Sequence, residues 1–404
     1  MSVAAAGDET AGNRDVDALL AANADRVRVL LDALRAGGAE VGASTPYDDV
    51  WALRFCLSHK DDAEAESCAR RTLAWRAKKS EMLAHAAKGE PYPRFARLEK
   101  YVAADYHGET LARGPLYIIR AGISNPKAMM DDFSEEDVLD FMMYRKEIGF
   151  LKCDARTRST RVLTKLVTVN DLNHVSLLSG PDKRFTAVLG KSSKLSEDYY
   201  PQLLDRAVLI NVPYVFGAIW SLMKPLLSAK TRSKVAICGA SDTRTGDVSK
   251  CPFAKLLNLD TVPSFLGGRC KCKGGCVGGC PNEQTVQVGK SDDDGMTRVT
   301  VAARDKLLVY RDVEPGDKVA WSVRVEAQGV EITAYLRACG CDAGKPTTLV
   351  RKHKHKAEMG LKEEVLEMHQ RGTLVFEFNN EYSLMNSKNV RYRAEVIEAA
   401  PSST

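Results

Sequence analysis

The chain has 404 residues, of which 44% are apolar and 27% charged, with a net charge of +5. This is a globular composition, long enough for two or three domains. The mild charge argues against a dedicated nucleic-acid binder but is compatible with weak attraction to an anionic membrane surface. The first 15 residues hold three acids and lack the pattern of a secretory signal. Without a secretory context for disulfides, the eleven cysteines predict a reducing compartment, the cytosol.

The first 90 residues predict helices. Residues 1–13 are small and polar, which predicts a disordered tail. Apolar residues recur at three- and four-residue spacing over 15–35, which predicts one amphipathic helix. A second helical block follows over 46–85. We therefore assign residues 14–90 to an N-terminal helical region.

The middle of the chain alternates between strands and helices. Buried strands are predicted over 115–122, 161–172, 208–212 and 234–238, with helices over 135–151, 181–199 and 213–227 between them. Such alternation predicts a mainly parallel sheet with right-handed crossovers.

The C-terminal region has a different periodicity. After an acidic, glycine-containing linker near 289–296, apolar and polar residues alternate over 317–327, 372–378 and 389–398. A period of two over several short strands predicts an antiparallel β-sandwich. The predicted fold class is therefore multidomain, α/β plus all-β.

Residues 207–223 form a run of seventeen residues without a charge, which approaches the length of a membrane span. Asn211 and Pro213 lie near its middle, and a helix beginning at a proline after a buried strand fits better. The helix over 213–227 is apolar on nearly every face, with Tyr214, Phe216, Ile219, Trp220 and Met223 among its residues. A helix of this kind is buried on both sides, and an ordinary central helix also explains the pattern. A protein spanning the membrane at 207–227 stays as an alternative.

Catalytic motifs are missing from the sequence. No G-x-G-x-x-G follows a predicted strand, and no G-x-S-x-G occurs. Asp171, His174 and Ser176 share one local segment, where a strand-end turn is the simpler interpretation. We therefore predict no catalytic residues and no enzyme.

Two clusters of polar residues have open interpretations. Cys270, Cys272, Cys276 and Cys280 are spaced C-x-C-x3-C-x3-C. They predict either a structural zinc site or free thiols in a loop. The basic run RKHKHK at 351–356 is expected in an insertion between strands, either docked on anionic lipid or solvated.

Several segments resemble known families. LRF (53–55), LAWR (73–76), the long segment 199–235, VPSFLGG (262–268) and CKCKGGC (270–276) resemble CRAL-TRIO proteins of the phosphatidylinositol/phosphatidylcholine transfer type. Residues 316–325 and 372–396 resemble the GOLD domain of their multidomain relatives. The resemblance implies a CRAL-TRIO N-terminal module from about residue 45, a lipid-binding domain over 91–283, a linker over 284–296 and a GOLD domain over 297–400.

The resemblance also implies a site. The sheet would form the floor of an apolar lipid pocket, and the helix over 213–227 would be its mobile gate. Thr231 and Lys234 would contact the headgroup phosphate. The family has an acidic residue and then an arginine directly after YYP, where this chain has Gln202 and Leu203. Gln202 can still hydrogen-bond a hydroxyl, but it lacks the negative charge of the family's acidic residue. The resemblance therefore favours phosphatidylinositol as the lipid but leaves the headgroup open.

The sequence therefore predicts a cytoplasmic protein that binds one phospholipid or similar lipophile and transfers it at membranes. Its contact with membranes would be peripheral and transient, and Golgi and endosomal membranes are candidates. The expected ligand is a lipid. No cofactor is expected, apart from the zinc ion that the cysteine cluster could bind. The alternative is an adaptor that holds a fixed lipid and binds protein partners through the GOLD domain.

Overall fold

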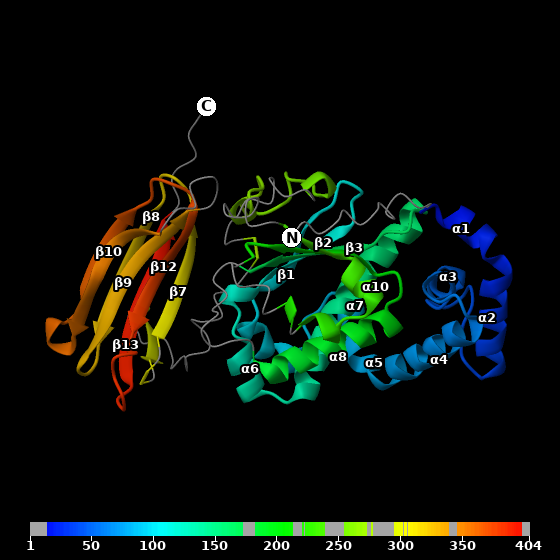
Figure 1. The fold of residues 1–404 in the computed structure, drawn as a ribbon, viewed down its shortest axis with the longest axis horizontal. Helices are drawn as coiled ribbons and strands as arrows, with labels where there is room; N and C mark the ends of the chain where they lie inside the picture. Colours follow the sequence, from blue (N-terminus) through cyan, green and yellow to red (C-terminus); the bar gives the residue numbers. More distant parts are fainter. Residues whose placement is uncertain are drawn as a thin grey trace.

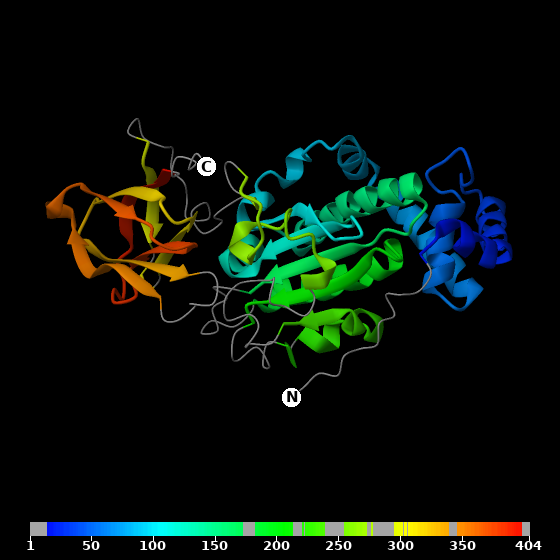
Figure 2. The same ribbon diagram turned by 90° about the horizontal axis from the view of Figure 1, so that it is seen from above.

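The computed structural model describes residues 14–172, 182–212, 220–221, 223–238, 254–272, 276–277, 295–301, 303–304, 306–338 and 346–397. Along the longest axis the chain passes from N-terminal helices through a central α/β domain to a β-sandwich (Figure 1). Figure 2 shows the same order from above. The predicted tail (1–13) and most of the predicted linker lie outside the described residues.

The N-terminal region contains five helices: α1 (Val16–Ala22), α2 (Ala24–Ala36), α3 (Asp49–Ser58), α4 (Asp62–Lys78) and α5 (Ser80–Lys88). Side chains of Asp15, Asp48 and Asp61 accept hydrogen bonds from the first turns of α1, α3 and α4, as N-caps do. The prediction of a single helix over 15–35 is wrong. The chain breaks at Asn23, whose side-chain amide donates to the carbonyl of Leu19 at 2.8 Å. Such local hydrogen bonds compete with helix continuation.

The central sheet has the order β1-β2-β3-β4-β5. Its strands are β1 (Ala104–Glu109), β2 (Pro115–Arg120), β3 (Leu166–Asp171), β4 (Leu204–Ile210) and β5 (Val235–Ile237). The pairs from β2 to β5 are parallel, and β1 joins antiparallel at the edge. The mainly parallel sheet is confirmed, whereas β1 was not predicted.

Helices and short 3₁₀ turns connect these strands. They are η2 (Pro93–Phe95), η3 (Leu98–Tyr101), η4 (Ala121–Ile123), α6 (Pro126–Asp132), α7 (Glu135–Thr160), α8 (Lys183–Tyr199), η5 (Lys224–Leu226), α10 (Ala229–Ser233), η7 (Ala254–Leu256) and η8 (Ser264–Leu266). Helices α7 and α8 lie together on one side of the sheet (Figure 1). Alternate strand residues such as Leu116 and Ile118 pack on the other side with Val262 and Leu266. The segment 254–277 therefore covers the second face of the sheet.

A buried ion pair fixes the N-terminal helices to the central domain. The Arg76 guanidinium in α4 donates two hydrogen bonds to the Glu147 carboxylate in α7, both at 2.8 Å. The side chains are 14% and 1% exposed. Burial alone would lower the pKa of Arg76, but the hydrogen bonds and charge of Glu147 raise it overall. Arg76 belongs to the LAWR motif, so that motif joins the two regions.

The C-terminal region is a sandwich of two antiparallel four-stranded sheets, with the orders β10-β9-β12-β7 and β11-β8-β13-β6. The strands are β6 (Thr297–Val301), β7 (Lys306–Val313), β8 (Lys318–Val325), β9 (Gly329–Ala338), β10 (Thr347–Lys356), β11 (Lys362–Glu367), β12 (Gly372–Asn379) and β13 (Lys388–Ile397), with η9 (Ala357–Met359) after β10. The inward residues form one apolar core that includes Trp321 and Phe376. The predicted sandwich is confirmed.

The basic run at 351–356 is not in a loop between strands, as predicted, but in the edge strand β10. His355 is 1% exposed, and its Nε2 lies 3.0 Å from the carbonyl oxygen of Gly360. Lys352 pairs with Glu331 at 2.8 Å on the neighbouring strand. Alternation within a strand therefore buries part of this run, and its charge is partly neutralised.

The sandwich docks on the central domain through charge and apolar contacts. Arg120, at the end of β2, makes two hydrogen bonds to Asp312 of β7, at 2.7 and 3.0 Å. Ala103, Tyr310 and Val375 form a small apolar cluster there. A bidentate pair with a buried guanidinium gives this contact a defined geometry.

Cys238, directly after β5, is disulfide-bonded. The expectation that the cysteines form no disulfides is therefore wrong at this position. The other six cysteines among the described residues are free.

Candidate functional site

The predicted headgroup residues lie at the end of the sheet where strands β3, β4 and β5 begin. Thr231 is in α10, and its hydroxyl donates to Glu197 of α8. Ser228 caps α10 and also donates to Glu197, at 2.6 Å. A ligand oxygen at this position would compete with Glu197 for the Thr231 hydroxyl.

Lys234 ends α10 and reaches the first residue of β4. Its Nζ donates to the carbonyl of Leu204 at 2.6 Å. Burial and the neighbouring charge of Lys230 lower the pKa of Lys234, while Asp205 and Glu197 partly oppose that shift. Lys234 is therefore a cation held close to the sheet, not a fully solvated loop lysine.

A second lysine, which the sequence analysis did not single out, lies beside it. Lys165 immediately precedes β3, and burial together with the charge of Lys234 lowers its pKa to about 8. Arg14 and Arg54 contribute further positive potential, and Asp205 opposes it. This group of cations would be stabilised by a bound anion.

Arg54, the central residue of LRF, is 1% exposed. Its Nη2 donates to Asp154 at 3.1 Å. Its Nε and Nη1 atoms are buried and have no hydrogen-bond partner among the described residues. Unsatisfied donors of a buried cation are costly, and the guanidinium carbon also lies 5.3 Å from the centroid of the Phe150 ring, a cation–π contact that partly offsets this cost. The motif itself was the sequence signal for this residue.

Gln202 lies at the same end of the sheet but faces the N-terminal helices. Its backbone is left-handed, with a φ of 61°. Its side-chain amide donates to the Ser58 hydroxyl at 3.0 Å, and the Lys230 ammonium donates to the Ser58 carbonyl at 3.2 Å. Leu203 is 3% exposed and packs in the core. The structure therefore brings Gln202 to α3 and to the helix that carries Thr231.

The predicted gate helix lies largely outside the described residues, including Tyr214, Phe216 and Ile219. Trp220 and Met223 are helical and half-buried. After them, Leu226 packs against Gly190 of α8, where the absence of a side chain permits close contact. Arg232 donates to the carbonyls of Leu227 and Lys224, at 3.1 and 3.3 Å. The C-terminal end of the predicted gate is thus attached to α8 and α10.

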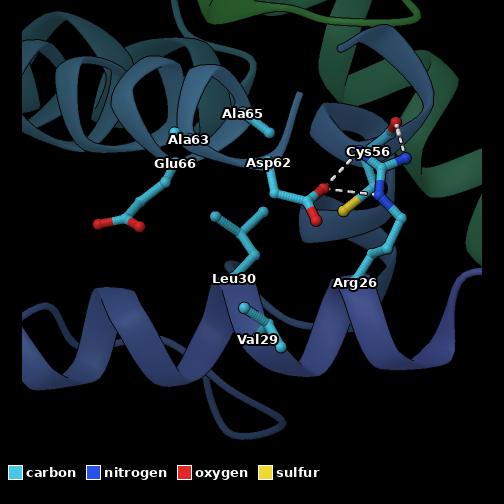
Figure 3. Close-up of a pocket in the computed structure, with 8 residues that line it drawn as sticks. All are labelled: Arg26, Val29, Leu30, Cys56, Asp62, Ala63, Ala65 and Glu66. Atoms are coloured by element: carbon cyan, nitrogen blue, oxygen red, sulfur yellow. Dashed lines mark hydrogen bonds and ion pairs between the residues drawn. The ribbon is translucent and has the colours of Figure 1, made fainter. Parts of the chain in front are cut away.

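A small depression lies between α2 and α4 (Figure 3). Its volume is about 160 Å³, below the roughly 300–1,000 Å³ typical of ligand pockets. Arg26 crosses it and donates to Asp62 at 2.6 Å and to the carbonyl of Cys56 at 2.9 Å. The arginine therefore satisfies the C-terminal end of α3, and the depression is too small for a phospholipid.

Three of the four predicted metal-ligating cysteines lie together. The ligand atoms of Cys270, Cys272, Cys276 and His107 all lie within 4.8 Å of one another. Cys280 lies outside the described residues. The histidine comes from β1 and was not part of the predicted set.

Comparison with known proteins shows what these features are similar to. Residues 99–268 match the model of the CRAL/TRIO domain. The match ends at Gly268, the last residue of the VPSFLGG segment, two residues before Cys270. The C-terminal sandwich is consistent with a GOLD-like domain.

Curated relatives resemble the chain over part of its length. The chain is 25% identical over 255 residues to the Sec14 cytosolic factor of Schizosaccharomyces pombe. This alignment covers 61% of this chain and 83% of that protein. It is 27% identical over 192 residues to the phosphatidylinositol/phosphatidylcholine transfer protein SFH9 of Arabidopsis thaliana, covering 46% of this chain and 31% of that protein. The chain thus spans about a third of the second relative.

Among solved structures, the crystal structure of Sfh5 aligns with a TM-score of 0.41 and 18% identity, over 57% of this chain and 83% of that one. That likeness is too weak to support a functional comparison. Within the described ranges, every helix falls short of the length and apolarity that a bilayer span needs. Residues 213–219 of the spanning alternative lie outside those ranges.

Proposed function

We propose that this protein binds one phospholipid in an apolar pocket of its CRAL/TRIO domain and exchanges it at membranes, without catalysing a reaction. The observation that carries the proposal is the match of residues 99–268 to the CRAL/TRIO domain model, together with the similarity of the chain to a relative named as a phosphatidylinositol/phosphatidylcholine transfer protein. The helix over 213–227 would be the gate. Burial of each acyl methylene contributes about 0.8 kcal/mol, so a closed pocket can compete with a bilayer.

The cations at the start of the strands support a phosphate-bearing headgroup. Burial and the charge of Lys234 lower the pKa of Lys165, and burial and the charge of Lys230 lower the pKa of Lys234. Arg54 adds buried donors without partners among the described residues. A phosphodiester between them would satisfy these donors and relieve the repulsion. Gln202 lies two residues before Leu204, whose carbonyl accepts a hydrogen bond from Lys234, so it would lie near the headgroup rather than the acyl chains.

The preferred headgroup is inositol. Glu197 already accepts hydrogen bonds from Ser228 and Thr231, so its carboxylate is positioned to accept from ring hydroxyls as well. The family pattern has its acidic residue directly after YYP, where this chain has Gln202. We propose that Glu197 supplies the charge-assisted hydrogen bonds that Gln202 cannot make.

The first test is the lipid that co-purifies with the full chain, measured by mass spectrometry. The proposal predicts one phospholipid per chain, enriched in phosphatidylinositol. Recovery of no stoichiometric lipid or isoprenoid would contradict the carrier function.

The headgroup assignment is tested by transfer between vesicles. Lys234→Ala is expected to lower phosphatidylinositol transfer about tenfold or more, from the loss of a charged hydrogen bond, and to lower phosphatidylcholine transfer less. Lys183→Ala is a matched control, because Lys183 is an exposed lysine at the first position of α8. Equal losses for both lipids would argue against a phosphate contact specific to the inositol lipid.

We also propose that the protein acts in the cytoplasm and contacts membranes peripherally, with the sandwich as the binding region for a protein partner. A protein that holds lipid but does not exchange it between vesicles would instead be an adaptor with a fixed ligand.

A further inference from the structure

The edge strand of the sheet and the cysteine-rich segment meet at one point. The Nε2 atom of His107 lies 3.3 Å from the Sγ atom of Cys270. The Sγ atoms of Cys270 and Cys272 are 3.5 Å apart. The Cys276 Sγ accepts a hydrogen bond from the amide of Cys272 at 3.4 Å. The four ligand atoms lie within 4.8 Å of one another although His107 and Cys270 are 163 residues apart in the chain.

The strand geometry at His107 has a specific cause. The pairing of β1 with β2 is interrupted between Tyr106 and Glu109, and Gly108 has a φ of +80°. A Cβ atom on Gly108 would lie 2.7 Å from the backbone oxygen of Thr261. The Thr261 hydroxyl accepts from the amide of Glu109 at 3.0 Å. The irregularity thus seats β1 against the segment that leads to the cysteines.

The VPSFLGG turn then brings Cys270 back to this strand. The amide of Cys270 donates to the carbonyl of Val262, and the amide of Ser264 donates to the carbonyl of Cys270, both at 3.0 Å. A Cβ atom on Gly268 would lie 1.9 Å from the carbonyl oxygen of Val262, so only glycine fits. Backbone hydrogen bonds therefore fix the first cysteine beside the histidine.

The distances match those around a tetrahedral zinc ion. Two thiolates bound at about 2.3 Å lie about 3.8 Å apart at a tetrahedral angle, and a thiolate lies about 3.6 Å from a bound imidazole nitrogen. The Sγ–Sγ separation of 3.5 Å and the Nε2–Sγ separation of 3.3 Å are close to these values. They are far longer than a disulfide bond of about 2.0 Å. The alternative is a set of weak thiol hydrogen bonds, which does not require a histidine and three sulfurs to converge.

We propose that His107, Cys270, Cys272 and Cys276 bind one structural Zn²⁺. Three thiolates and one imidazole complete the four ligands of a closed site, with no position left for a substrate. Binding would release the thiol protons, since zinc binds the thiolate form. In this proposal the fourth ligand is His107, whereas the cysteine spacing had predicted Cys280.

The site would hold together three parts of the molecule. It joins the edge strand β1 to the segment 254–277, which covers one face of the sheet. Lys271, between two of the ligands, also lies 3.5 Å from Glu314 at the end of β7. A zinc ion here would therefore stabilise the end of the CRAL/TRIO domain next to the sandwich. The proposal does not depend on the lipid that the domain carries.

The test uses the full chain purified under reducing conditions and loaded with Zn²⁺. Metal analysis is expected to give one zinc per chain. X-ray absorption at the zinc edge is expected to show three sulfurs at about 2.3 Å and one nitrogen at about 2.0–2.1 Å. No bound zinc, or a shell of four sulfurs, would overturn the proposal. This spectrum needs no variant, so a misfolded mutant cannot obscure it.

Variants then identify the ligands by competition with a chromophoric chelator. His107→Ala should weaken zinc binding by more than about 100-fold, because loss of an outer-shell partner alone costs about 10–100-fold. Cys272→Ser should do the same, and because its side chain is exposed, the substitution leaves the core packing unchanged. Cys280→Ser and His85→Ala are the matched controls and should keep wild-type affinity. Retained affinity in His107→Ala with loss in Cys280→Ser would overturn the assignment of the fourth ligand.

Discussion

The substitution Lys165→Met distinguishes the effect of Lys165 on the stability of the lipid-free protein from its proposed effect on lipid binding. Burial and Lys234 lower the pKa of Lys165 from 10.5 to about 8. That difference of about 2.5 units corresponds to at most about 3.4 kcal/mol of destabilisation of the charged form. Lys165 is partly exposed in the wild-type protein, and the substitution also removes its attraction to Asp205. We therefore expect Lys165→Met to raise the free energy of unfolding of the lipid-free protein by about 1–3 kcal/mol. Methionine is of similar length and leaves no cavity.

The sign of the pH dependence follows from the direction of the shift. The folded-state pKa of about 8 lies below the unfolded value of 10.5. Between these pH values the unfolded chain binds more protons, so the Lys165 contribution becomes less destabilising as pH rises. The advantage of Lys165→Met should therefore be full below pH 8 and shrink toward zero near pH 10.5.

The assay is denaturant unfolding of lipid-free protein at several pH values, paired with vesicle transfer of phosphatidylinositol. Transfer should fall about 10- to 150-fold, as expected for a lost charged hydrogen bond of about 1.5–3 kcal/mol. Lys183→Met is the control, and it should change neither quantity. A destabilised Lys165→Met protein, or one with unchanged transfer, would refute the reasoning.

Three further substitutions test the framework around the site. Arg76→Ala should lower the free energy of unfolding by about 3–5 kcal/mol, because it leaves the Glu147 carboxylate buried and unpaired; Arg28→Ala, on an exposed helix face, is the control in denaturant unfolding. Asp312→Ala should loosen the sandwich from the central domain and speed proteolysis between them, since it removes the two hydrogen bonds that the Arg120 guanidinium donates to Asp312; an unchanged cleavage rate would contradict that role. Gly268→Ala should cost about 1–3 kcal/mol by overpacking, and an unchanged melting temperature would show that the turn relaxes freely.

Periodicity predicted much of the fold because burial dictates it directly. The parallel strands contain short apolar runs, such as 116–119 and 207–210, and the sandwich strands alternate, so both were visible in the sequence. Strand β1 was not, because ADYHGE is a half-buried edge strand with polar residues at most positions. The basic run at 351–356 was predicted as a loop for the same reason. On an edge strand, charged side chains can face solvent while the backbone keeps its hydrogen bonds to the neighbouring strand.

The candidate site was only partly visible because its residues come from distant segments. Thr231, Lys234 and Gln202 came from the family resemblance, and the structure brings them to one end of the sheet. Lys165 has no local motif, and its significance arises only from the neighbouring charges. His107 could not be assigned from cysteine spacing, since 163 residues separate it from Cys270. Local patterns report local structure, whereas a site depends on tertiary contacts.

The central claim is that the CRAL/TRIO domain holds one exchangeable phospholipid. Native mass spectrometry of the full chain before and after incubation with vesicles of isotope-labelled phosphatidylinositol tests it directly. The account predicts one phospholipid per chain at the start, replaced by the labelled lipid after incubation. A chain without lipid, or one whose lipid never exchanges, would contradict it.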